Sequence, residues 1–252
     1  MAVPVLQRIA DYLTRRMGLL KVKFSQRIRR TPSVESFRFL PKKKISFIPG
    51  QFLQLVFDPD NPGNKELNKY LSFSCSPAHD YVEVTKRLSE SKFSQALKDL
   101  KPLDEIVINA PLGACVFKEE YGKIAFLIGG IGITPVISII EYIADKKIET
   151  DLCLIYSNRT EEEIAFKKEL DYWRSLNKNF KISYLVTDYQ PKDKSCIFGR
   201  IDKDFIRAEI PDLENRILFI FGPPKMVEAM QAVSLEAGAK KENLRIENFI
   251  GY

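Results

Sequence analysis

The chain has 252 residues, which is enough for two domains of ordinary size or one large domain. A hydrophobic share of 45% and a charged share of 29% are typical of a soluble globular protein and exclude a disordered or collagen-like chain. The net charge of +6 suits an acidic partner or a phosphate-bearing ligand, whereas no aromatic-and-basic signature or zinc spacing supports a nucleic-acid site.

The cysteine and histidine content narrows the chemistry further. Four cysteines lie far apart without a C-x-x-C or iron–sulfur pattern: Cys75, Cys115, Cys153 and Cys196. Scattered cysteines in a chain without a secretion signal are typical of reduced core residues, so we expect a cytoplasmic protein. His79 is the only histidine, which excludes most Ser-His-Asp and multi-histidine metal sites.

Residues 1–18 differ in pattern from the rest of the chain. Ile9, Leu13 and Met17 recur at helical spacing, with arginines on the other faces. The spacing predicts a helix that packs on the body, or a loose tail, and a membrane-surface anchor is the alternative. A secretion signal is disfavoured because the segment lacks an apolar centre.

Short apolar stretches broken by Pro, Gly and Asn-Pro-Gly turns fill residues 20–117. Strands are predicted at residues 52–57, 81–85 and 105–108, and one helix at residues 92–100. Many short strands at this spacing favour a small antiparallel barrel. We therefore expect residues 19–118 to form an antiparallel β-barrel domain that follows the extension.

After residue 122 strand-like and helix-like runs alternate. The strand-like runs are residues 124–128, 152–156, 181–186 and 217–221, and the helix-like runs are residues 135–145, 161–176 and 225–237. This alternation predicts βαβ units and a parallel sheet with helices on both faces. The uncharged run 124–140 falls short of the roughly 20 residues of a membrane span, and fits a strand, a glycine turn and a helix. We place an α/β domain with a parallel sheet at residues 119–252.

A glycine-rich turn joins the first strand of this domain to its first helix. The turn reads GGIGITP from Gly129 to Pro135. Small residues here let a phosphate approach the backbone, where the helix N-terminus offers free N–H groups. Thr134 is expected to cap the helix and Pro135 to occupy its first turn. Because a strand precedes and a helix follows, we favour a nucleotide site over a merely tight connection.

The end of the next strand indicates which nicotinamide nucleotide the site would bind. An NAD-binding unit usually has Asp or Glu at the end of its second strand, to hold the ribose hydroxyls. Here the strand ends in Ser157-Asn158-Arg159. A hydroxyl and a guanidinium suit a 2′-phosphate, which leans toward NADPH, although NADH stays open because Arg159 could equally be a solvated residue at a helix start.

Several further motifs occur in a fixed order along the chain. These are IPGQF at residues 48–52, KYLSFS at 69–74, VTKR at 84–87, a serine-bearing helix start at 91–94, the glycine turn, Gly-Pro-Pro at 222–224 and ENFIGY at 247–252. The ordered set resembles the ferredoxin–NADP reductase superfamily from about residue 20 to the C-terminus. Members of this family join a flavin-binding barrel to a nicotinamide-binding domain.

The family's Arg-x-Tyr-Ser flavin motif corresponds to residues 69–72. Lys69 replaces the arginine that binds flavin phosphate, so a charge remains but the bidentate fork is lost. Leu71 replaces the tyrosine that stacks on the flavin, while Ser72 keeps the hydroxyl that the family places near flavin N5. The family's phosphate-binding Gly-x-x-Ser corresponds to Ser91 through Ser94. Without the resemblance, Ser72 is an ordinary strand serine and the helix start an ordinary cap.

At the C-terminal end, the resemblance implies a site beside the nicotinamide. Phe221 stands where the family commonly has a cysteine before the Gly-Pro-Pro turn. Glu247 and Tyr252 match an acidic residue and a terminal tyrosine that lie near the flavin in relatives. The alternative is that the terminal aromatic residues only close the core.

Taken together, the resemblance implies catalytic roles for Ser72, Glu247 and Tyr252, with no metal ion. It implies cofactor contacts from a larger set: Lys69, Tyr70, Leu71, Ser72, Lys86, Ser91, Phe93, Ser94, Gly130, Gly132, Thr134, Ser157, Arg159, Gly222, Pro223, Met226 and Tyr252. The expected cofactors are FAD, with FMN as the alternative, and NADPH or NADH. The expected reaction is hydride transfer from NAD(P)H to the flavin, which carries the difficult chemistry.

The electrons then need an acceptor outside this chain, since a fused ferredoxin would require four clustered cysteines. We expect an acidic carrier protein, ferredoxin or flavodoxin, at a basic face of the barrel. The residues of this predicted basic face are Arg27, Arg29, Arg30, Arg38, Lys42, Lys43 and Lys44. The alternatives are a reductase component of a multi-component oxygenase, a nucleotide-binding module that has lost flavin, and a lysine run that is only solvated surface.

Overall fold

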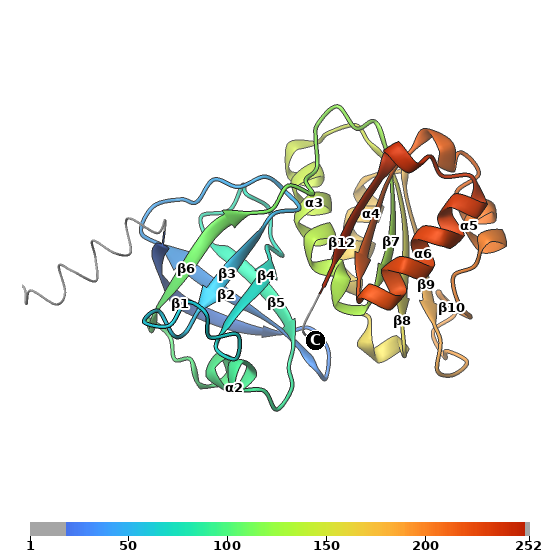
Figure 1. Ribbon diagram of the computed structural model, residues 1–252. Coiled ribbons are helices and arrows are strands. Elements are labelled where there is room, and N and C mark those ends of the chain that lie inside the picture. Colours follow the sequence, from blue (N-terminus) through green and yellow to red (C-terminus); the bar gives the residue numbers. More distant parts are fainter. Residues whose placement is uncertain (1–18, 250–252) are drawn as a thin grey trace, which may run out of the picture.

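A computed structural model describes residues 19–249 of the chain. The helix expected within residues 1–18 and the role expected for Tyr252 lie outside the described residues. The described chain folds into two sheets, one antiparallel and one parallel, which lie side by side (Figure 1). Within these residues, no helix has both the length and the apolar character needed to cross a bilayer.

The barrel sheet is antiparallel, with the strand order β4-β3-β6-β1-β2-β5. Its strands are β1 (Leu19–Arg29), β2 (Val34–Pro41), β3 (Phe52–Val56), β4 (Asn68–Ser72), β5 (Val82–Arg87) and β6 (Glu105–Leu112). Inward side chains such as Phe37, Phe39 and Leu53 are fully buried in its core. Helix α2 (Lys92–Asp99) adds Phe93 and Leu97 to this core. Burial of this apolar face is what stabilises the barrel.

The parallel sheet has the strand order β10-β9-β8-β7-β11-β12. Its strands are β7 (Lys123–Gly129), β8 (Asp151–Asn158), β9 (Phe180–Val186), β10 (Cys196–Phe198), β11 (Ile217–Gly222) and β12 (Leu244–Asn248). Its helices are α3 (Ile133–Lys146), α4 (Lys167–Leu176), α5 (Lys203–Glu209) and α6 (Pro224–Ala237). Single-turn helices are η1 (Gly130–Gly132), η2 (Glu161–Glu163), η3 (Leu213–Asn215) and η4 (Lys241–Asn243).

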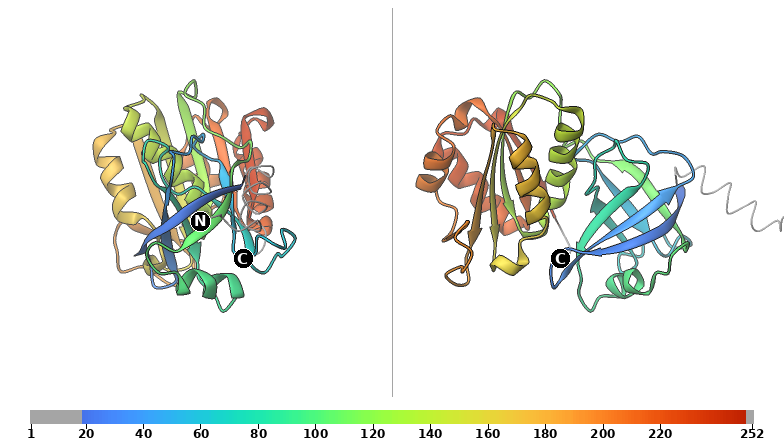
Figure 2. Two further views of the ribbon diagram at one scale, coloured as in Figure 1. Left: turned by 90° about the vertical axis from the view of Figure 1, so that its left-hand side faces the viewer. Right: turned by 180° about the vertical axis from the view of Figure 1, so that it is seen from behind.

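Helices cover both faces of the parallel sheet. In the left view of Figure 2, α4 lies on one side of the sheet and α6 on the other. Helices α3 and α4 share one core cluster with the sheet, whereas α5 and α6 share a second. Because both faces are covered, the central strands β7 and β11 read as nearly continuous apolar runs rather than alternating ones.

The structure confirms the predicted fold class, an antiparallel barrel sheet followed by an α/β domain with a parallel sheet. Two local predictions are wrong. The predicted helix at residues 161–176 begins only at Lys167, because Phe166 has a left-handed backbone with φ of 61°. Thr134 does not cap α3 but lies inside its first turn, where its Oγ1 donates to the carbonyl of Ile131 at 3.2 Å.

The turn between β1 and β2 reaches across to the second domain. Val34 is buried in the core cluster of α3 and α4. The Arg30 guanidinium hydrogen-bonds Glu83 of the barrel at 3.0 Å and also Glu169 of α4, and it lies 4.4 Å from the ring centroid of Phe166. One arginine thus joins both domains through a mostly desolvated contact.

Two further contacts hold the domains in one arrangement. On α3, the Glu141 carboxylate accepts from the backbone N–H of Ser76 at 2.6 Å and lies 3.0 Å from Nε2 of His79. On η2, Glu163 pairs with Arg87 at the end of β5. These contacts lie on different elements, so the cleft between the domains has a defined shape.

Candidate functional site

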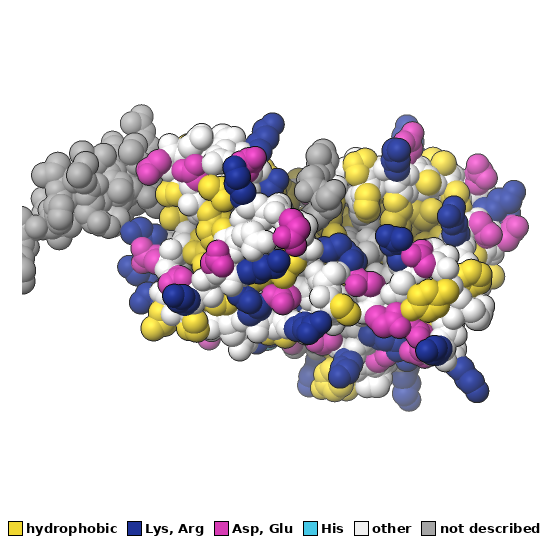
Figure 3. Space-filling model, turned by 90° about the horizontal axis from the view of Figure 1, so that it is seen from below, with side chains coloured by type: hydrophobic (Ala, Val, Ile, Leu, Met, Phe, Trp, Pro, Cys, Tyr) yellow, Lys and Arg dark blue, Asp and Glu magenta, His cyan; other side chains and the backbone are white. Residues whose placement is uncertain are grey.

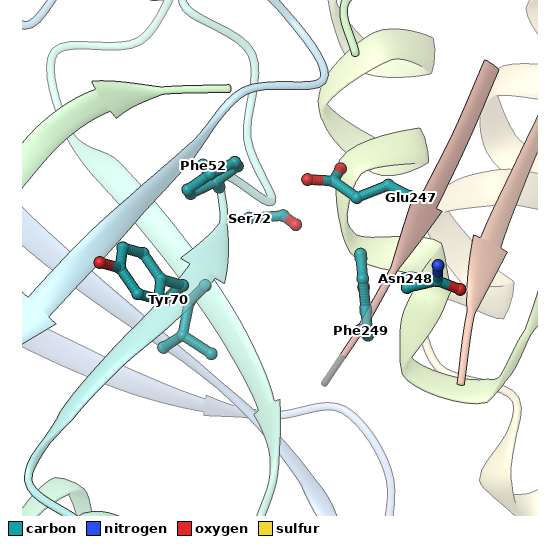
Figure 4. A pocket seen from close by; sticks show the side chains of 7 residues that line it. Phe52, Tyr70, Ser72, Glu247, Asn248 and Phe249 are labelled. Carbon is teal, nitrogen blue, oxygen red and sulfur yellow. The ribbon is translucent and has the colours of Figure 1, made fainter. Parts of the chain in front are cut away.

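A cavity of about 260 Å³ lies between the two domains, at the ends of β4 and β12. The barrel lines it with Phe52, Tyr70, Leu71 and Ser72, and the C-terminal strand lines it with Glu247, Asn248 and Phe249. Figure 4 shows the Ser72 hydroxyl and the Glu247 carboxylate both pointing into the space between the domains. Two of the three predicted catalytic residues therefore meet in one cavity.

The Glu247 carboxyl is chemically the most unusual group of this cavity. Its Oε2 atom is buried and has no hydrogen-bond partner among the described residues. Burial disfavours the charged form and raises the pKa of Glu247 to about 7. A carboxyl with this pKa can take up or release a proton near neutral pH, as an acid–base group requires.

The alternation of side chains along β4 decides which of its residues have an exposed side chain. Tyr70 is 60% exposed and Leu71 only 3%, because neighbouring side chains of a strand point to opposite faces. Leu71 therefore belongs to the barrel core, while Tyr70 and Ser72 share the outer face. The ring of Tyr70 meets that of Phe52 edge-on, with centroids 5.8 Å apart. One wall of the cavity is therefore aromatic. Its ring is that of Tyr70, one residue before the position where the family motif has its tyrosine.

A cationic region lies at Lys69 and Lys86. Lys86 is buried, and this burial, followed by the charge of Lys69, lowers its pKa. The start of α2 follows β5 closely in sequence, and the Ser91 hydroxyl accepts from the backbone N–H of Ser94 at 3.3 Å. Ser94 itself is fully buried among serines, and Phe93 lies in the barrel core. Two ammonium groups close enough to affect one another suit a phosphate.

The three glycines of the GGIG turn serve different purposes. A Cβ at Gly129 would lie 2.0 Å from Sδ of Met226, and one at Gly132 would lie 2.4 Å from the carbonyl oxygen of Phe221. Both glycines therefore allow close packing within the protein. Gly130 has φ of 51° and open space at its Cβ position, and its carbonyl accepts from the Tyr156 hydroxyl at 3.1 Å. Of the three, Gly130 is the one that leaves room for a ligand.

The carboxyl ends of β8 and β11 border the same edge of the sheet. Ser157 is half-buried and Arg159 is exposed at the end of β8, where Arg159 pairs with Asp188. Beyond β11, Gly222 is buried and Pro223 precedes the first turn of α6. Phe221, at the position of the family cysteine, is fully buried and stacks on Phe249 with centroids 6.4 Å apart.

Sequence reasoning did not assign roles to Phe52 and Asn248, which also line the cavity. Both stand inside runs that carried the resemblance, namely IPGQF and ENFIGY. The motifs that carried the resemblance therefore contained enough information to predict these two residues as part of the site. Their pairing in one cavity depends on the domain arrangement.

The predicted basic face is smaller than the sequence indicated. Arg30 and Arg38 turn inward and share the buried carboxylate of Glu83, with Arg38 Nε at 2.7 Å from its oxygen. A buried carboxylate requires such partners, so these two charges do not face a carrier protein. The exposed members of the set are Arg27, Arg29, Lys42, Lys43 and Lys44.

Known oxidoreductases are similar to this chain in sequence. A family model for the oxidoreductase NAD-binding domain matches residues 126–232. The chain is 27% identical to NADH-cytochrome b5 reductase 2 of Mycosarcoma maydis over 199 residues, which is 77% of this chain. It is 26% identical to the glycine betaine monooxygenase reductase subunit of Chromohalobacter salexigens over 239 residues, which is 92% of this chain. The alignments cover 57% and 64% of those relatives' lengths.

Solved structures show the same two-domain fold. A ferredoxin NADP⁺ reductase from Neisseria gonorrhoeae with bound FAD and NADP superposes with a TM-score of 0.78 at 20% identity, covering 92% of this chain and 98% of that one. The fold, the NAD-binding domain and the curated relatives agree with the resemblance that the motifs indicated. Residues 126–232 thus match the oxidoreductase NAD-binding domain family, and the described chain has the two-domain fold of this ferredoxin NADP⁺ reductase.

Proposed function

We propose that this chain is a flavin-dependent oxidoreductase that accepts hydride from NAD(P)H and passes electrons to a separate carrier. The observation that supports this most directly is the convergence of Ser72 and Glu247, from different domains, on one cavity beside an aromatic wall. Such a cavity, placed between a barrel and a nucleotide-binding sheet, can bring two ring systems into contact.

The residues of the cavity fit a flavin ring. Tyr70 offers an exposed aromatic side chain, Ser72 offers a hydroxyl, and Glu247 leaves a buried carboxyl oxygen without a partner among the described residues. Lys69 and Lys86 are suited to the flavin phosphates. When bound, the flavin, FAD or alternatively FMN, would supply two-electron and one-electron chemistry that no side chain here can supply.

The protein groups would then orient the flavin ring and supply or accept a proton. The Ser72 hydroxyl would hold the reacting edge of the ring by a hydrogen bond, and Glu247 would store or release a proton near pH 7. Gly130 and the turn before α3 would receive the nucleotide pyrophosphate, since there is open space at the Cβ position of Gly130 and a helix start favours a phosphate. Phe249 would close the cavity on the side of the second domain.

The acceptor is proposed to be a separate protein. Named relatives include cytochrome b5 reductases and reductase subunits of oxygenases, which supports such an acceptor. For this chain we propose an acidic carrier of the ferredoxin or flavodoxin kind at the exposed basic residues 42–44, and the reductase component of an oxygenase is the second candidate. A carrier-reduction rate that did not fall as salt is raised would contradict this docking.

An absorption spectrum of the purified full-length protein tests the central proposal. We expect flavin bands that bleach after anaerobic addition of NADH or NADPH. Bands that neither nucleotide bleaches would contradict the hydride-transfer function. A colourless protein that cannot be reconstituted with FAD or FMN would leave the nucleotide-binding module as the function.

A further inference from the structure

A second cavity, of about 610 Å³, lies inside the α/β domain, between the last turns of α3 and α4 and the amino ends of β8 and β9. Figure 3 views the molecule from the opposite side, that of the strand carboxyl ends, where acidic and basic side chains are interspersed. The cavity instead has mainly apolar walls, which include Ile140, Ile143, Leu152, Trp173, Leu176 and Phe180. Its volume is in the range of small-molecule sites. Because the glycine turn lies at the other end of α3, this cavity is separate from the cleft between the domains.

The two walls of this cavity differ in exposure. The inner wall consists of core residues, since Ile140, Leu152 and Phe180 are each at most 3% exposed. The outer wall on α4 is open to solvent, because Trp173 is half-buried and Leu176 is 61% exposed. Covering apolar surface that faces water is favourable. The walls therefore favour a ligand with an apolar body.

The hydroxyl of Thr150, which lines the cavity before β8, is buried without a hydrogen bond. Thr150 is 3% exposed, and its Oγ1 has no partner among the described residues. The neighbouring Asn177 carboxamide is fully engaged, since its Nδ2 donates to the Thr150 carbonyl at 3.2 Å and its Oδ1 accepts from the backbone N–H of Asn179 at 2.9 Å. A buried hydroxyl without a partner is costly. Thr150 thus has a hydrogen-bonding capacity that a ligand can use.

The charged groups that line the cavity compensate one another. Lys147, Lys178 and Glu149 are all exposed, and none of them forms an ion pair with another described residue. Lys147 ends α3 and Lys178 follows the end of α4. Each helix C-terminus carries a partial charge of about −0.5, so the two lysines are opposed by one carboxylate and two helix ends. The cavity therefore offers no excess charge to either an anion or a cation.

We propose that this cavity binds an uncharged, mostly apolar small molecule with one hydroxyl or carbonyl group. The apolar walls take the body of the ligand, and the Thr150 hydroxyl, after rotation about the Cα–Cβ bond, pairs with its polar group. A charged head group would lose hydration in the cavity without meeting a net opposite charge. This site goes beyond the proposed reductase function and does not depend on it.

A fluorescence titration of the full-length protein tests the site. Trp173 is the only tryptophan of the chain, so its emission reports on this cavity. The probes are 1-octanol, octanoate and octylammonium, which share one alkyl chain and differ in the head group. We expect 1-octanol to shift the emission saturably to shorter wavelength, because it displaces water from the indole. The two charged probes should bind at least about tenfold more weakly.

Two variants connect this signal to the cavity. Ala144→Phe, on the last turn of α3, places a ring in the cavity and should abolish the saturable shift. Thr150→Val keeps the shape of the side chain without the hydroxyl and should weaken 1-octanol about fivefold, the size of one hydrogen bond. The same variant should raise the midpoint of urea unfolding, because an unpaired buried hydroxyl is removed. The control is Ser175→Ala, which removes an exposed α4 hydroxyl outside the cavity and should leave the affinity unchanged.

Three results would overturn the proposal. These are equal affinities for the three probes, a saturable shift that survives Ala144→Phe, and an unchanged 1-octanol affinity in Thr150→Val. The absence of any saturable shift in the wild-type protein would also overturn it. None of these results bears on the reductase function, which the bleaching of flavin bands by NADH or NADPH tests separately.

Discussion

The Sδ atom of Met226 lies 2.0 Å from the point that a Cβ at position 129 would occupy. The missing side chain of Gly129, at the end of β7, therefore lets α6 pack directly against the glycine turn. Gly129→Ala should push the flexible end of Met226 aside and lower the free energy of unfolding by about 1 kcal/mol, the low end of the range for overpacking, because no backbone has to move. Thermal and urea unfolding measure this change.

Matched glycines separate the causes of such a loss. Gly122→Ala should change stability by less than about 0.5 kcal/mol, because a Cβ there meets nothing within 4 Å. Gly130→Ala should cost about 1 kcal/mol through its positive φ rather than through a clash. In a double-mutant cycle, Met226→Ala should remove most of the cost of Gly129→Ala, and strict additivity would contradict the contact.

The buried carboxyl of Glu247 makes stability depend on pH. Its pKa is raised by burial from 4.5 in the unfolded chain to about 7 in the folded protein. The folded protein thus holds the proton more tightly, so this group lowers stability progressively as pH rises from 4.5 to 7, with the full loss above 7. Glu247→Gln should remove this dependence and stabilise the protein at pH 8 by up to about 3 kcal/mol.

Chemical denaturation at pH 5 and pH 8 checks this, with Glu236→Gln on the exposed side of α6 as the control for loss of a negative charge. Equal effects of the two substitutions at both pH values would contradict the role of burial. If the proposed function holds, the rate of flavin reduction should also show an inflection near pH 7 that Glu247→Gln removes.

The alternation of β4 separates binding from stability at neighbouring positions. Tyr70→Ala should weaken flavin binding about tenfold, because an exposed aromatic face is lost, while Tyr70→Phe should retain binding. Leu71→Ala should instead destabilise the fold by about 2–5 kcal/mol, since Leu71 is a core residue. Fluorescence titration with flavin and urea unfolding measure the two effects. Unchanged flavin affinity in Tyr70→Ala would show that the wall is elsewhere.

The inward arginine at the domain boundary should matter more for stability than an exposed one. The Arg30 side chain is 11% exposed and pairs with Glu83 and Glu169. Arg30→Met leaves buried carboxylate oxygens with fewer partners and should cost about 3 kcal/mol. Arg174→Met breaks an exposed pair on α4 with Asp171 and should cost less than about 0.5 kcal/mol. Similar losses in the two variants, measured by urea unfolding, would contradict a joint role of Arg30 in both domains.

Local pattern was enough for much of the architecture. The uncharged run at residues 124–140 located β7 and the first turns of α3, because a strand and a helix that are buried on several sides must be apolar there. Motif order located Ser72 and Glu247, since each motif is a contiguous stretch of chain. The break at Phe166 was missed because nothing in its neighbourhood signals a left-handed residue, and tertiary packing of its buried ring overrides local preference.

The sequence by itself determined that an antiparallel barrel precedes an α/β nucleotide domain, and which residues carry the motifs of the family. Only the tertiary structure decided which of those residues face one another. Tyr70 offers an exposed ring at the cavity while Leu71 is buried in the barrel core, because the alternation of side chains along the strand sets the outward face. Arg159 meets Asp188, and Ser72 shares a cavity with Glu247, because pairing between distant strands and domains brings them together. Those contacts depend on the burial of the barrel core and of the cores on both faces of the parallel sheet, which no local window of sequence contains.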